Sequence, residues 1–136
     1  MTLQPLLRWL GALGVAAMTT SGAASAADVH VMISAGFYQA YSELVPAFEH
    51  SSGHRVLTTR GPSLGDSPES IPARLKRGEP ADLVIIVGAS IDDLARQGLV
   101  NNAKETEAAQ ALARFLASPQ AAAAIIKSGL SPVAQP

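Results

Sequence analysis

The sequence contains no cysteine, and only 4% of its residues are aromatic and 15% charged. The absence of cysteine excludes disulfide cross-links and thiolate metal sites, so the fold must be held together by its apolar core. The 10 Lys and Arg residues nearly balance the 11 Asp and Glu residues, which gives a formal net charge of -1. This balance excludes recruitment of nucleic acid or of an acidic membrane through bulk charge.

Residues 1–27 have the pattern of a secretory signal peptide. Arg8 precedes an apolar run from Trp9 to Met18, and the sequence Ala24, Ser25, Ala26 supplies the small residues that a signal peptidase accepts. The apolar run has about half of the roughly 20 residues that a membrane-spanning helix needs. We therefore expect export, cleavage near residue 26 or 27, and no stable membrane insertion after cleavage.

The rest of the chain alternates between strand and helix patterns. Short runs rich in β-branched or apolar residues at 29–34, 55–59 and 83–87 predict three strands, and helical spacing follows each of them. The run at 83–87 is continuously apolar, which is typical of a parallel strand covered on both faces, and we expect it to be the central element. The order predicts an α/β three-layer sandwich with a small parallel sheet.

Helix ends are signalled by glycine and by capping residues. Gly53, Gly78, Gly98 and Gly129 each follow a helical pattern and predict its end, whereas Ser90 with Asp93 predicts a capping box at a helix start. The polar segment 101–105 is the one plausible joint, and two further helices follow it. The predicted organisation is a signal peptide at 1–27, the N-terminal part of the α/β lobe at 28–100, and C-terminal helices at 101–136 packing back on the same lobe.

Two loops are placed where ligands bind in open parallel sheets, at the carboxyl ends of strands. The first follows the strand at 29–34 and the second, at 61–65, follows the strand at 55–59. Each loop offers one hydroxyl and glycine but no basic side chain, so backbone amides and a helix dipole would hold an anion. The alternative is that both are ordinary Gly/Ser turns. The candidate ligand-binding residues are Ser34, Ala35, Gly36, Phe37, Ser63, Leu64 and Gly65.

Metal binding and catalysis find little support in the sequence. His50 and His54 have the spacing of two ligands on one helix face, but Gly53 lies between them and zinc sites usually need three or four ligands. Neither Ser34 nor Ser63 has a base partner evident in the sequence. We therefore expect no metal, no cofactor and no catalytic residues, with a serine hydrolase as the enzyme alternative.

Beyond these patterns, the chain is similar to the molybdate-type periplasmic solute-binding proteins of ABC transporters. The segments that carry the resemblance are 33–37, 61–65, 71–85 and 114–130. The resemblance implies one lobe of a type II periplasmic binding protein, a periplasmic location, an ABC transporter permease as partner, and a small oxyanion such as molybdate as ligand. It assigns the oxyanion contacts to Ser34 with the amides after it, and to Ser63 with the amide of Leu64.

The sequence also departs from that family. Ala35 and Gly36 stand where the family often has adjacent hydroxyl residues, and Asp66 would repel an anion if it faced the site. Residue 100 leads almost directly into the C-terminal helices, so the resemblance implies that most of the second lobe is absent. A single lobe could not close over its ligand, and we expect weak binding. An inactive remnant without ligand binding is the alternative.

Overall fold

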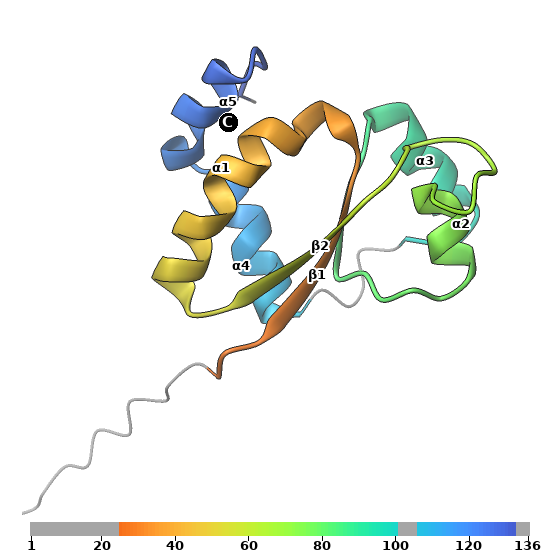
Figure 1. Ribbon diagram of the computed structural model, residues 1–136, viewed down its shortest axis with the longest axis horizontal. Helices are drawn as coiled ribbons and strands as arrows, with labels where there is room; N and C mark the ends of the chain where they lie inside the picture. The colour runs from red at the N-terminus through yellow and green to blue at the C-terminus, as the bar shows by residue number, and fades with distance from the viewer. Residues whose placement is uncertain (1–24, 101–105, 133–136) are drawn as a thin grey trace, which may run out of the picture.

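A parallel sheet of three strands separates two groups of helices in the computed structural model, which describes residues 25–100 and 106–132 (Figure 1). The strands are β1 (Asp28–Ile33), β2 (Arg55–Arg60) and β3 (Leu83–Ile85), in the order β2-β1-β3. This arrangement confirms the predicted three-layer α/β fold. Nearly all of the expected signal peptide and the expected joint at 101–105 lie outside the described residues.

The central strand of the described sheet is β1, so the expectation that the run at 83–87 is central was wrong. β1 pairs along its whole length with β2, whereas β3 pairs with β1 over three residues. The apolar run nevertheless has the cause we inferred, because β3 is covered on both faces. Leu83 and Ile85 pack into one core, and Val84 and Ile86 pack into the other. Coverage of both faces therefore does not require a strand to have two neighbours.

The larger core lies between the sheet and three helices, α1 (Ala35–Ser52), α4 (Glu107–Leu116) and α5 (Ala122–Lys127), with the short 3-10 turn η1 (Pro119–Ala121) leading into α5 (Figure 1). Alternate residues of β1 point into it because successive strand side chains face opposite sides. Tyr41 of α1 is buried there, and its hydroxyl lies 2.7 Å from the Thr58 hydroxyl of β2. Burial raises the pKa of Tyr41.

The smaller core lies on the opposite face of the sheet, beneath α2 (Ile71–Lys76) and α3 (Gly88–Arg96) (Figure 1). Its fully buried residues are Met32 of β1, Ile71 and Leu94. Within the described residues, no helix combines the length and apolar character needed to cross a bilayer.

Glycine ends the helices as the sequence predicts. Gly98 has a φ of 68°. Its amide donates to the Ala95 carbonyl and the Leu99 amide donates to the Leu94 carbonyl, each at a distance of 3.0 Å. This pair of bonds is a Schellman motif, and the left-handed conformation that it needs suits glycine. Gly78 and Gly129 repeat the pattern.

The capping box predicted at Ser90 was wrong. α3 begins two residues earlier, directly after the extended Val87, so Ser90 lies inside the first turn. It is 2% exposed, and its hydroxyl has no hydrogen-bond partner. Asp93 instead accepts hydrogen bonds from Arg96 and Gln97 on the outer side of the helix.

Candidate functional site

A pocket of about 460 Å³ lies at the edge of the sheet where all three strands end. The segment after β1 opens α1, β2 contributes its last residue and the loop after it, and the segment after β3 contributes the residue before α3. The structure thus brings together the two loops that the sequence singled out and adds a third. The lining residues are Ser34, Ala35, Gly36, Arg60, Gly61, Pro62, Ser63 and Val87.

Backbone hydrogen bonds fix the first loop between its two neighbours. The Ser34 amide donates to the Ile85 carbonyl at 3.0 Å, and the Gly61 amide donates to the Ile33 carbonyl at 3.2 Å. These bonds extend the β-ladders beyond the last paired residues of β1. The three strand ends are therefore held in register at the rim of the pocket.

Ser34 is the N-cap residue of α1 but does not cap it with its side chain. The residue is 7% exposed, lines the pocket, and its hydroxyl makes no hydrogen bond within the described residues. The first amides of a helix have no partner inside the helix, and the helix dipole places partial positive charge there. The start of α1 thus offers a hydroxyl and amides whose natural partner is an anion.

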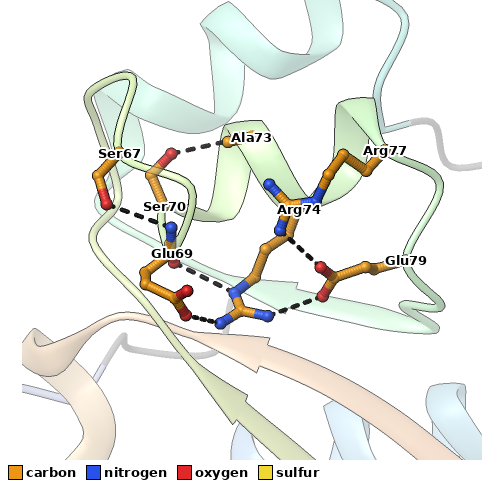
Figure 2. Close-up of polar contacts among 7 residues, drawn as sticks. All are labelled: Ser67, Glu69, Ser70, Ala73, Arg74, Arg77 and Glu79. Carbon is orange, nitrogen blue, oxygen red and sulfur yellow. Dashed lines mark hydrogen bonds and ion pairs between the residues drawn. The ribbon is translucent and has the colours of Figure 1, made fainter.

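The second loop is held against α2. The Ile71 amide donates to the Pro62 carbonyl at 3.0 Å, and a side chain at Gly61 would collide with the Glu69 carbonyl oxygen. Ser70, which is fully buried, donates from its hydroxyl to the Gly65 carbonyl (2.8 Å) and accepts from the Ala73 amide (3.3 Å) as the N-cap of α2. Figure 2 shows the second of these bonds.

Arg74 joins the end of this loop to the segment after α2 (Figure 2). Its guanidinium donates to the Glu69 carbonyl (3.2 Å), to the Glu69 carboxylate and to the Glu79 carboxylate (2.8 Å), and Arg77 also donates to Glu79 (2.6 Å). The hydrogen bonds from Arg74 and Arg77 lower the pKa of Glu79. None of these residues lines the pocket, so the cluster supports the loop and does not contact a ligand there.

Arg60 is the functional candidate that the sequence patterns missed. It is the last residue of β2, and its guanidinium carbon lies 3.9 Å from the centre of the Tyr38 ring. No carboxylate lies within ion-pairing distance of it in the described part of the chain. The two loops contain no basic side chain, and the sequence therefore predicted a site without one. Residues at the carboxyl end of a parallel strand also reach the ligand edge, and a search that included the residues next to each predicted strand end could have found both Arg60 and Val87.

Three of the predicted ligand-binding residues do not line this pocket. Phe37 faces a separate apolar groove of about 850 Å³ between β3, α4 and α5. Leu64 is 63% exposed, and the carbonyl of Gly65 is taken by Ser70. Asp66 is exposed and does not line the pocket either.

The histidines and Asp82 lie away from the pocket. Asp82 accepts from the His30 amide at 2.8 Å, and its own amide donates to the His30 carbonyl over the same distance, so it ties β3 to β1. His54 accepts from the Ala27 amide at 3.2 Å. No group of three or more potential metal ligands occurs among residues 25–100 and 106–132.

Comparisons with known proteins assign the chain to a family. Residues 29–107 match the family model of the bacterial extracellular solute-binding proteins. Over 91 residues the chain is 38% identical to an aconitate isomerase of a Pseudomonas species, and the match covers 67% of this chain and 35% of that protein. The chain thus spans about a third of the length of this relative, and no solved structure matches it. Because the family model covers more than half of the sequence and all three strands, the chain belongs to the bacterial extracellular solute-binding protein family.

Proposed function

We propose that this protein is the periplasmic solute-binding component of an ABC transporter and that the pocket at the strand ends binds a small oxyanion, of which molybdate is an example. The observation that carries the proposal is Ser34, a buried residue at the start of an 18-residue helix, which lines the pocket and whose hydroxyl does not cap the helix. A hydroxyl with no partner among the described residues is available to a ligand.

The charges around the pocket favour an anion. Its lining contains one guanidinium, two serine hydroxyls and the N-terminus of α1, and no lining residue is acidic. A cation would meet the positive end of the helix dipole without a compensating carboxylate, whereas an anion would be stabilised by it. Asp66, the residue that would have opposed this, is exposed outside the lining.

The affinity of this lobe alone should be low. Val87 is 52% exposed, and the first residues of α1 are exposed as well, so water reaches a ligand in the pocket. Hydrogen bonds and charge attraction are weaker in a hydrated site than in an enclosed one. We therefore expect dissociation constants in the millimolar range, and complete absence of binding is the competing outcome.

We propose a binding role without catalysis. A serine nucleophile needs an oriented base, and no imidazole or carboxylate lines the pocket with Ser34 and Ser63. The likeness to an aconitate isomerase favours a second candidate, action on an unsaturated tricarboxylate. An isomerisation by proton transfer needs a general acid or base, and neither an imidazole nor a carboxylate is among the residues that line the pocket.

Isothermal titration tests the proposal. Molybdate, tungstate and sulfate are titrated to millimolar concentrations into the protein and into the double variant Ser34→Ala, Ser63→Ala. We expect the double variant to bind about tenfold more weakly, because two hydrogen bonds to a charged ligand are lost.

Ser42→Ala is the matched control, since Ser42 is an exposed serine of α1 whose hydroxyl donates to the Gln39 carbonyl. It should leave binding unchanged. Absence of heat with every anion, or equal binding by the double variant, would contradict the proposal. Turnover of cis- or trans-aconitate by the same preparation would favour the isomerase instead.

A further inference from the structure

Arg60 differs from most other arginines of the described chain in having no acidic partner. Arg55, Arg74, Arg77 and Arg96 each pair with a carboxylate. Arg60 instead lies over the ring of Tyr38, one turn into α1. A cation–π contact positions a guanidinium without using its hydrogen-bond donors, so the donors of Arg60 remain available at the pocket.

The pocket is therefore lined by two different anion-attracting groups. One is the hydroxyl of Ser34 with the first amides of α1, and the other is Arg60, the last residue of β2, whose guanidinium lies against Tyr38 of α1. Fixed neutral donors such as the Ser34 hydroxyl and the first amides of α1 are sufficient to hold a dehydrated oxyanion. The guanidinium is a planar fork that matches a second planar anionic group through two parallel hydrogen bonds.

The volume of the pocket is consistent with a ligand larger than one inorganic oxyanion. The pocket is open to solvent and has a volume of about 460 Å³, whereas one water molecule occupies about 30 Å³ of liquid. A compact tetrahedral ion seated at Ser34 would leave most of this space to solvent. An organic anion of several carbon atoms would use it.

We infer that the pocket selects an organic anion with at least two carboxylates, one held at Ser34 and the start of α1 and the other on Arg60. The inference rests on the proposed function, because it names the ligand class of the same site. Arg60 is then the residue that determines specificity, and Tyr38 positions it.

The test compares ligands that differ in the number of carboxylates. Citrate, succinate, acetate, molybdate and sulfate are titrated into the protein and into Arg60→Gln, Arg60→Lys and Tyr38→Leu, each first checked for an unchanged circular dichroism spectrum. Arg114→Gln is the control, because it removes the same charge from an exposed position of α4 outside the pocket.

We expect citrate and succinate to bind more tightly than acetate, molybdate and sulfate. Arg60→Gln should weaken citrate binding about tenfold, the usual scale for one charge-assisted hydrogen-bonding group, and should change acetate binding less than about twofold. Arg60→Lys should keep part of the affinity, since it retains the charge but not the fork. Tyr38→Leu should give an intermediate loss, and Arg114→Gln none.

Different outcomes would overturn the ligand class and the binding role. Tight binding of molybdate or sulfate with weak binding of citrate would overturn the inference and leave the proposed function standing. An equal loss for every anion in Arg60→Gln would also overturn it, because Arg60 would then act only as a general positive charge. Absence of binding by all five anions would overturn both.

Discussion

The two faces of the sheet differ in how they are held. On the α1, α4 and α5 face, thirteen buried residues form one continuous core, whereas three do so on the α2 and α3 face. The smaller face has polar ties in addition, namely the buried cap at Ser70 and the cluster around Arg74 (Figure 2). Apolar burial dominates stability on the first face, and directional contacts share that role on the second.

The candidate site is lined by residues from both faces of the sheet. Ser34 opens α1 and belongs to the well-packed face, whereas Ser63 and Val87 belong to the segments around α2 and α3. Segments with few buried apolar contacts open at lower free energy than core segments. We therefore expect one wall of the pocket to be rigid and the other to open more readily.

The largest expected effect is that of Leu112→Ala in the larger core. Leu112 of α4 is 0% exposed, and its truncation removes buried methyl groups and leaves a cavity, which costs about 4 kcal/mol of unfolding free energy. Urea unfolding followed by circular dichroism measures this. Ile126→Ala on α5 is the control, because Ile126 is 62% exposed and its truncation should cost less than about 0.5 kcal/mol. Similar losses in the two variants would mean that the α4 face is not the main core.

A smaller and more local effect is expected for Leu94→Ala in the smaller core. Leu94 is 1% exposed but has fewer buried neighbours, so its surroundings can relax, and we expect a loss of about 2 to 3 kcal/mol. Amide hydrogen exchange should show faster exchange in α2 and α3, with α1 and α4 still protected. If protection falls equally in all four helices, the two faces unfold as one unit and the contrast between them is wrong.

The fold was largely predictable because its signals are local. Gly98 and Gly129 could be assigned as helix ends from sequence, since a left-handed residue after an amphipathic run is a strong local requirement. The capping box at Ser90 was predicted wrongly because a serine and an acidic residue three positions apart also occur inside helices. The first turn of α3 is instead placed by the position at which β3 ends. The order of strands in the sheet is a property of long-range pairing, which the apolar run at 83–87 does not encode.

The site was predictable in position and only partly in composition. Parallel strands end at one edge, so the two loops carrying Ser34 and Ser63 were expected to meet, and they do. Which side chains of a loop face the pocket depends on the hydrogen bonds that hold the loop in place. In the loop 61–65, Ser70 and Ile71 donate hydrogen bonds to backbone carbonyls, and Leu64 is left exposed to solvent. Arg60 was not predicted because the aromatic ring that it contacts, Tyr38, is 22 positions away in the sequence and adjacent only in the fold.

The smallest expected effect is a pH-dependent change in melting temperature when Glu79, in the charged cluster on the α2 face, is replaced. Hydrogen bonds from Arg74 and Arg77 lower the pKa of Glu79, so the folded protein binds a proton there less readily than the unfolded chain. The stabilisation is present above the unfolded pKa, about 4.3 for glutamate, and is lost as the pH falls through the lower folded value. Glu79→Gln should therefore melt at a lower temperature than the original protein at pH 6, and the difference should shrink by pH 3.

Asp66→Asn is the control for that experiment, because Asp66 is an exposed loop carboxylate with no ion-pair partner in the described residues. It should melt like the original protein at pH 6 and at pH 3, with both measured by differential scanning calorimetry at equal ionic strength. A Glu79→Gln difference that persists unchanged at pH 3 would show that Glu79 acts through its uncharged contacts. The α2 face would then depend on packing as the α4 face does, and its charged cluster would contribute little to holding the second loop.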